Sequence, residues 1–449
     1  MEGPNLFPVK ERDQHHRPFA KMMKVPSAFF VAILWVAVAS ASLLPQWNVG
    51  IVPSTKINAS AGLPQIQNAL HITVYNATKN AKRNPFGTYN HGPILAELDG
   101  TFFMSWYNAP TGENNFKRSV FAYSTDQGST WSEPGVLFTN FTVRGQENGP
   151  WTYLPGDGDR LPNRLYTQSG TQDAGLHIEG IVSVMRQVGL DGPTKLGKSF
   201  WLNGTVPKGF EHLGFPTYLE MDSQTRKDAE QIIKSMVRTT VKYPDVAARH
   251  HGKMVYNERS LYMVPGTRRL VNLLRGQYAP KNLSASTCTL PYDPRAVPLK
   301  PNPTSFSCRP GVGDAFMNLV EVLNLTAGNY KDVEPRTCQW STPEIVSIPD
   351  SHSRTCSSVL PGGGVYIVGN QIAEGRDPVT LSLSKDGINF DRAFSVRYGA
   401  PPVKYPGEAK VVGFQYPGAM VLKDTMWVSY SLGKEDIGVT RFSLEELGL

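Results

Sequence analysis

Two side chains of this chain that could do covalent or acid–base chemistry stand just before short apolar runs. Tyr416 lies in Gly413–Ala419, and Glu258 precedes Leu261–Val264. A tyrosine becomes nucleophilic near neutral pH only when a base takes its proton, because its ordinary pKa is about 10. The carboxylate of Glu258 is a suitable base. The alternative is a purely structural role, in which Tyr416 only packs its ring beside Pro417.

Two arginines occupy comparable places. Arg376 stands just before one apolar run, and Arg275 stands at the end of another. Guanidinium groups bind carboxylates through paired hydrogen bonds, so these arginines could hold an anionic ligand. The simpler interpretations are an ion pair between Arg275 and Glu258 across a hairpin, and a pair between Arg376 and Asp377 within a loop.

Four further polar side chains are weaker candidates. His91 precedes a strand-like run, and Glu113 lies in the loop Thr111-Gly112-Glu113-Asn114-Asn115. A lone histidine is more often structural than catalytic, and a glutamate in a Gly-Asn loop is commonly solvated. Arg354 and Glu147 are candidates for the rim of the same site. No spacing of metal ligands is present, so we expect neither a metal nor a cofactor.

Short strands and tight turns must position these residues. Ile94–Leu98 and Thr101–Tyr107 flank Asp99-Gly100, which is a strong hairpin signal. Strand and turn recur along the chain without alternation with helices, which predicts an all-β fold of radial blades. We expect the one convincing helix near Gln224–Val237, in an insertion at about 207–251, and a Cys- and Pro-rich insertion at about 277–345.

One turn carries a specific motif. Ser124-Thr125-Asp126-Gln127-Gly128-Ser129-Thr130-Trp131 has the pattern S-x-D-x-G-x-T-W, and Ser384–Phe390 repeats it in weaker form. The aspartate can accept hydrogen bonds from amides of its own turn, and the glycine can take a positive φ. The motif resembles the Asp-box of sialidase-like β-propellers. We interpret the two copies as repeated β-units, against the alternative of two unrelated hairpins.

The resemblance extends from about residue 88 to 443 and implies a six-bladed β-propeller with retaining exo-glycosidase chemistry. In such a site Glu113 would protonate the leaving group, where an aspartate is usual. Tyr416, deprotonated towards Glu258, would attack the anomeric carbon. Arg275 and Arg376 match the second and third arginines that grip the sugar carboxylate in sialidases.

His91 stands where the first of those three arginines is expected. A histidine grips a carboxylate more weakly and in a pH-dependent way, which argues against sialic acid and allows a uronate instead. Three functions stay open: hydrolysis of a terminal acidic sugar, a polysaccharide lyase that uses His91 and Tyr416 as its acid–base pair, and a glycan-binding propeller without turnover.

Composition narrows the class of partner. The 449 residues carry a net charge of +7, with 18% charged residues, 41 Gly and 35 Pro. The positive charge is scattered and no basic run with aromatics occurs, so nucleic acid is not an expected partner. We expect a monomer with a glycan ligand.

The first 45 residues predict entry into the secretory pathway. A cytosolic tail at 1–24 carries five basic residues and precedes 25–45, where Val25–Leu44 is uncharged. Such a segment inserts with its N-terminus in the cytosol. It is either a cleaved signal peptide, with a site at Ala39-Ser40-Ala41, or a type II membrane anchor. Residues 46–449 would then form a lumenal or extracellular propeller.

Two further patterns agree with that location. N-x-[ST] glycosylation signals occur six times after the apolar segment, at Asn58, Asn76, Asn140, Asn203, Asn282 and Asn324. The cysteines are even in number and confined to one stretch, at Cys288, Cys308, Cys338 and Cys356. Two disulfides are expected, in one of three possible pairings.

Overall fold

The computed structural model describes residues 44–449 apart from 79–85, 114–116, 141–146, 158–159, 171–182, 203, 236–254, 268, 278–281, 290–343 and 352. The hydrophobic segment expected at 25–45 lies almost wholly outside these residues. Within the described part, no helix combines the length and the apolar character needed to cross a membrane.

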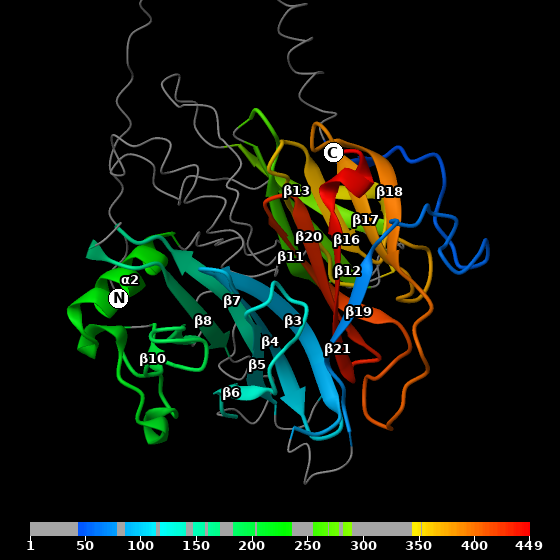
Figure 1. The fold of residues 1–449 in the computed structure, drawn as a ribbon. Coiled ribbons are helices and arrows are strands. Elements are labelled where there is room, and N and C mark those ends of the chain that lie inside the picture. The colour runs from blue at the N-terminus through cyan, green and yellow to red at the C-terminus, as the bar shows by residue number, and fades with distance from the viewer. Residues whose placement is uncertain are drawn as a thin grey trace, which may run out of the picture. The chain divides into compact units, whose positions relative to one another are not determined.

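Antiparallel sheets dominate the described residues, as expected for an all-β fold (Figure 1). Five sheets are present in this part of the chain, and each is built mainly from strands that follow one another in sequence. The first contains β3 (Tyr89–Leu98), β4 (Thr101–Ala109), β5 (Arg118–Ser124) and β6 (Gly135–Phe138). The second contains β7 (Glu147–Leu154), β8 (Arg164–Gly170), β9 (Ser183–Val188) and β10 (Phe200–Trp201). A sixth blade is not among the described residues.

The third sheet contains β11 (Val255–Met263), β12 (Arg269–Gln277), β13 (Asn282–Thr289) and β14 (Glu344–Pro349). Strand β13 and the first two residues of β14 lie within the stretch expected as a Cys- and Pro-rich insertion, whereas residues 290–343 lie outside the described part of the chain. The fourth sheet contains β15 (Cys356–Val359), β16 (Val365–Gly369), β17 (Val379–Ser384) and β18 (Asn389–Arg397), with β1 (Gln46–Trp47) added in parallel to β18.

The fifth sheet joins the two ends of the described chain. It contains β19 (Phe414–Leu422), β20 (Thr425–Leu432) and β21 (Asp436–Ser443), and its fourth strand is β2 (Leu70–Tyr75) from the other end of the chain. Pairing of β2 with β21 closes the fifth sheet with an early strand. This closure leaves the C-terminal strand without a free edge on that side.

The first strands of the sheets contact one another. β3 lies against both β7 and β19, and β15 lies against both β11 and β19. Residues at the start of these first strands, though far apart in sequence, are therefore brought together. This is the packing of propeller blades around an axis.

Apolar layers between neighbouring sheets hold the blades together. Alternate residues of a strand face opposite sides of its sheet. Ile94 accordingly packs with Trp151 of the second sheet, whereas the next residue, Leu95, packs with Met420 of the fifth. The same alternation explains why the first strands are buried along almost their whole length.

Both Asp-box turns form as the motif predicts. The Asp126 carboxylate accepts hydrogen bonds from Thr130 N at 2.9 Å and Thr130 Oγ1 at 2.6 Å, and Gly128 has a φ of +77°. In the second copy Asp386 accepts from Ile388 N at 2.8 Å and Asn389 N at 2.7 Å. These bonds stabilise the charged form and lower the pKa of Asp386 to about 2, although burial acts in the opposite direction.

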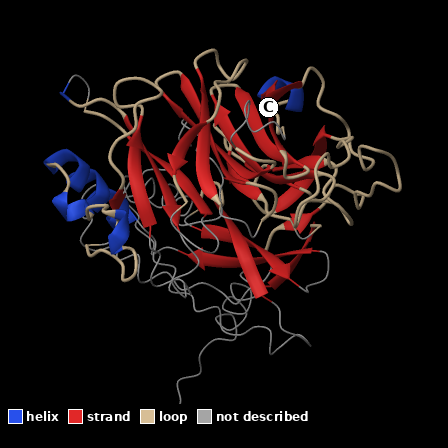
Figure 2. Ribbon diagram, turned by 90° about the horizontal axis from the view of Figure 1, so that it is seen from below, coloured by secondary structure: helices blue, strands red, loops and turns tan. Residues whose placement is uncertain are grey.

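The helical insertion packs on the second sheet, at the margin of the strands (Figure 2). The helix α2 (Ser223–Ser235) follows the short 3-10 helices η2 (Glu211–Leu213) and η3 (Tyr218–Glu220). Its Asp228 forms a buried ion pair with Arg164 of β8, with 2.5 Å between Oδ2 and Nε, and accepts a hydrogen bond from Tyr166. A third 3-10 helix among the described residues, η6 (Leu444–Leu447), follows β21.

This buried pair makes the attachment of α2 testable. We expect Asp228→Ala to lower the free energy of unfolding by about 3–5 kcal/mol, because Arg164 would stay buried without its partner. Lys227→Ala, one residue away on the exposed side of the helix, should change it by less than about 0.5 kcal/mol. Urea unfolding followed by tryptophan fluorescence measures both, and equal losses would contradict the assignment.

Candidate functional site

Four of the first strands, β3, β7, β11 and β19, each contain a shift in strand register near their N-terminal end. The pairing of β3 slips between His91 and Ile94, that of β7 between Asn148 and Trp151, that of β11 between Asn257 and Arg259, and that of β19 between Gln415 and Gly418. A bulge of this kind turns one side chain away from the regular alternation and is common beside functional sites. The residues inside the slips include Gly92-Pro93, Gly149-Pro150, Glu258 and Tyr416-Pro417.

Tyr416 is held in a strained backbone conformation. Its φ is +51°, in the left-handed region that a bulky residue rarely adopts. Its ring lies 4.1 Å from the ring of His91, centroid to centroid, with the planes tilted by 43°. The guanidinium carbons of Arg354 and Arg376 lie 5.6 and 5.8 Å from the centre of the same ring. Strain of this kind, retained beside charged groups, is typical of functional sites.

Arg376 is positioned by the chain that leads into β19. Phe414 N donates to Arg376 O at 2.7 Å, and Gly413, with a φ of +129°, packs directly against the arginine backbone. A Cβ at Gly413 would lie 2.7 Å from that carbonyl oxygen. The approach of the two segments therefore requires glycine, and it sets Arg376 beside Tyr416.

His91 is fully buried among charged and aromatic side chains. Its Nδ1 lies 2.8 Å from Ser431 Oγ, and its ring meets Tyr107 edge-on at 5.4 Å. Burial, followed by the positive charges of Lys434, Arg376, Arg354 and Lys117, lowers the pKa of His91 well below its ordinary value. The imidazole is therefore neutral near pH 7.

Glu113 pairs with a lysine that the sequence did not single out. Lys434 Nζ lies 2.6 Å from Glu113 Oε2 and 5.9 Å from the centre of the Tyr89 ring. Burial favours the protonated form of Glu113, but the charge and hydrogen bond of Lys434, together with Lys117, lower its pKa overall. Glu113 is thus ionised near neutral pH, which does not suit a proton donor.

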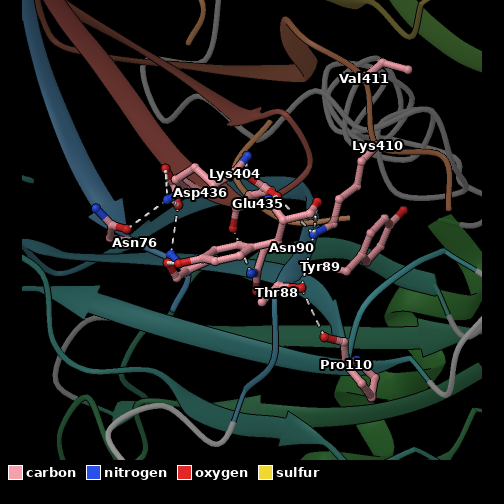
Figure 3. Close-up of polar contacts among 12 residues, drawn as sticks. Asn76, Thr88, Tyr89, Asn90, Pro110, Lys404, Lys410, Val411, Glu435 and Asp436 are labelled. Atoms are coloured by element: carbon pink, nitrogen blue, oxygen red, sulfur yellow. Dashed lines mark hydrogen bonds and ion pairs between the residues drawn. The ribbon is translucent and has the colours of Figure 1, made fainter. Parts of the chain in front are cut away.

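A buried ionic network anchors the turn that carries Lys434 (Figure 3). Glu435 accepts hydrogen bonds from Lys410 Nζ at 3.1 Å and from the backbone amides of Lys404 and Tyr405, each at 2.7 Å. Its backbone carbonyl accepts from Asn90 Nδ2 at 2.8 Å. The network ties the segment before β19 to the start of β3, next to His91.

Three predicted residues are placed by their backbone alone. Glu258 lies in the slip of β11, and Arg275 pairs with the preceding Asn257, so the two stand on adjacent strands. Glu147 is the first residue of β7 and pairs with Gly170. The side chains of all three lie outside the described part of the structure, and so do Cys308 and Cys338, so the disulfide pairing stays a prediction.

The described side chains therefore gather His91, Glu113, Arg354, Arg376 and Tyr416 as one neighbourhood. No sequence pattern indicated four further residues of this neighbourhood, which lie on adjacent strands and turns: Tyr89, Tyr107, Ser431 and Lys434. A usable signal was present in the sequence: a proline after His-Gly, Asn-Gly and Tyr marks three of the four slips. Among the described residues, no group of three or more His, Cys, Asp or Glu side chains could hold a metal ion.

Comparison with known proteins agrees with this architecture. The family model described as "Beta-prop_BT_1020:-like, N-terminal beta propeller" matches residues 53–152. No curated protein sequence matches the chain. Of the solved structures, a sialidase aligns with 89% of this chain at 18% identity and a TM-score of 0.60. The chain spans 35% of the length of that sialidase.

Two other structures align less well. A protein of unknown function from Dyadobacter fermentans aligns with 84% of this chain and all of its own, at 13% identity and a TM-score of 0.43. A Hadza microbial sialidase aligns with 84% of this chain and 69% of its own, at 11% identity and a TM-score of 0.41. The chain has the fold of a sialidase-like β-propeller, and this likeness concerns the fold alone.

The close packing of Gly92 within the register shift of β3 can be tested by substitution. A Cβ at Gly92, where φ is +64°, would lie 2.6 Å from the Tyr107 ring, whereas one at Gly100, where φ is +86°, would meet nothing within 4 Å. Both Gly→Ala variants should lose about 1 kcal/mol through the left-handed backbone. Gly92→Ala should lose about 1–3 kcal/mol more because Tyr107 must move. Thermal and urea unfolding measure the difference, and equal losses would contradict the packing.

The Glu113–Lys434 pair predicts a pH dependence. Because the pKa of Glu113 is lowered in the folded protein, its ionised form stabilises the fold above the ordinary pKa of a glutamate, about 4.3. That stability is lost as the pH falls through the lowered pKa. Lys434→Met should therefore be less stable than the wild type at pH 7, and the difference should shrink in acid. Lys423→Met is a matched control, since Lys423 is exposed and has a similar positive φ. A difference that does not depend on pH would refute the pairing.

Proposed function

We propose that this chain is an enzyme that cleaves a glycosidic bond beside an acidic sugar, with Tyr416 as its central catalytic residue. The observation that supports this most directly is the contact of Tyr416 with His91, Arg354 and Arg376 at the bulged start of β19. A strained tyrosine between two guanidinium groups is costly to maintain for packing alone.

The charges favour an anionic ligand. Arg354 and Arg376 approach Tyr416, and Lys117 and Lys434 add positive potential at His91. Arginine side chains recognise carboxylates in two-point contacts, which suits a sugar acid. Positive charge also lowers the cost of deprotonating the phenol.

The fold supports hydrolysis as the first candidate reaction. Tyr416 would attack the anomeric carbon, the glycosidic oxygen would leave with a proton from Glu113, and water would then release the sugar from the tyrosine. Glu258, from the slip of β11, would take the phenol proton. The lowered pKa of Glu113 is a weakness of this route, because the acid form is scarce near neutral pH.

The pair of His91 and Tyr416 favours a second candidate, β-elimination on a uronate. A neutral His91 would take the proton from C5, which is acidic because it is next to the carboxylate. The electron pair would form the C4–C5 double bond as the oxygen at C4 leaves with a proton from Tyr416. Arg354 and Arg376 would neutralise the carboxylate. A third possibility, glycan binding without turnover, is an outcome of the experiment below.

We further propose that the protein reaches the secretory pathway lumen or the cell exterior. The glycosylation signals Asn58 and Asn76 are exposed in the structure, as attachment of a glycan requires. This location suits a glycan substrate, and it follows from the charge and hydropathy of residues 1–45.

The experiment compares wild type with Tyr416→Phe on sialosides, uronides and uronate-containing polysaccharides. Loss of the phenolic proton should lower kcat by about 10²–10⁴-fold. Tyr398→Phe is a control, because Tyr398 is 39% exposed and follows β18, the strand farthest in sequence from the first strand of its blade. Hydrolysis creates a reducing end with uptake of water, whereas elimination creates an unsaturated uronate that absorbs ultraviolet light. Full activity of Tyr416→Phe would refute the assignment, and binding without any product would establish a lectin-like protein.

A further inference from the structure

Beside Tyr416, His91 has one ring nitrogen with a partner and one without. Nδ1 lies 2.8 Å from Ser431 Oγ, whereas Nε2 is buried and has no hydrogen-bond partner among the described residues. The two nitrogens lie on different edges of the ring, so Nε2 is directed away from Ser431. Its chemical role depends on which nitrogen carries the single proton of the neutral ring.

Ser431 has one hydroxyl proton and two acceptors within reach. Its Oγ lies 3.2 Å from the carbonyl oxygen of Gln415, the residue before Tyr416, and 2.8 Å from His91 Nδ1. If the proton goes to Gln415, the serine oxygen accepts a hydrogen bond from Nδ1–H, and both contacts are satisfied. If it goes to Nδ1, the ring proton must sit on Nε2 as a buried N–H without an acceptor.

The first arrangement has the lower energy for two reasons. Buried N–H groups without a partner are rarer in proteins than buried acceptors without one. Among the described residues, the charges that act most strongly on the ring are also positive: Lys434 from the turn after β20, Arg376 before β17, Arg354 before β15 and Lys117 before β5. The negative charge of Glu113 in the same neighbourhood is paired with Lys434. Positive charge attracts a nitrogen lone pair and repels an N–H dipole.

We infer that Ser431 is a positioning residue, which holds His91 as the Nδ1–H tautomer and leaves Nε2 as a hydrogen-bond acceptor in the site. Ser431 lies on β20 opposite Gln415, so the same hydroxyl also supports the backbone at the slip that carries Tyr416. One side chain thus orients both the histidine and the tyrosine.

This tautomer narrows the substrate class, given the proposed function. An acceptor at His91 repels a carboxylate oxygen and attracts a hydroxyl group or an acidic C–H. The sugar carboxylate therefore lies on the side of Arg354 and Arg376, with a proton-bearing atom beside it that faces His91. A uronic acid has this arrangement, because C5 carries both the carboxylate and a hydrogen. In sialic acid the carbon that carries the carboxylate has no hydrogen.

Nuclear magnetic resonance tests the tautomer without any substrate. In protein with ¹⁵N-labelled histidine, correlations between ring nitrogens and carbon-bound ring protons distinguish Nδ1–H from Nε2–H, and the signals missing in His91→Gln identify this residue. We expect Nδ1–H in the wild type and a shift of the proton towards Nε2 in Ser431→Ala. Ser429→Ala is the matched control, since Ser429 is also buried on β20 but its Oγ faces Pro93 O at 3.5 Å.

An Nε2–H tautomer in the wild type, or an unchanged tautomer in Ser431→Ala, would overturn the inference. The wild-type spectrum decides this even if Ser431→Ala fails to fold. On an active uronate substrate, Ser431→Ala should lower kcat/KM at least about tenfold, the worth of one hydrogen bond, with most of the loss in kcat. If the tautomer is as inferred and no glycan is turned over, the proposed enzymatic function fails while the role of Ser431 stands.

Discussion

The removal of His91 from water is the constraint on which the rest of the candidate site depends. A buried imidazole surrounded by ammonium and guanidinium groups cannot become charged near neutral pH, because burial and the neighbouring charges act in the same direction. Because His91 stays uncharged, the ammonium and guanidinium groups around it can interact with an anionic ligand or with the phenol of Tyr416. Were His91 exposed and protonated, the same cations would repel it, and its stacking on Tyr416 would be lost.

This arrangement costs free energy of folding, and contacts in other parts of the fold offset that cost. Tyr416 has a left-handed backbone, and a buried lysine and glutamate lie near the same strands. The slips at the starts of β3 and β19 release the strands from regular pairing where the rings must meet. The Glu435 network secures the segment before β19, so that the strained tyrosine has a rigid support.

Local features of the chain were predictable, and their physical reasons are local as well. The Asp126 and Asp386 turns form because the hydrogen-bond acceptors and the glycine lie within a few residues of one another. The hairpin at Asp99-Gly100 forms for the same reason. The helix at Ser223–Ser235 was expected at Gln224–Val237, but its anchorage to Arg164 through Asp228 was not, because that contact joins residues far apart in the sequence.

By itself, the sequence determined the strand-and-turn character of the protein, the Asp-box turns, and the positions of His91, Arg376 and Tyr416 at or just before the starts of strands. It did so because alternation, turn residues and short motifs act over a few residues. The tertiary structure alone decided that His91 is neutral, that Glu113 is ionised beside Lys434, and that Ser431 lies between His91 and Gln415. Those properties depend on burial and on the distances between charged groups that come from several sheets. Those distances are set only when the blades pack together.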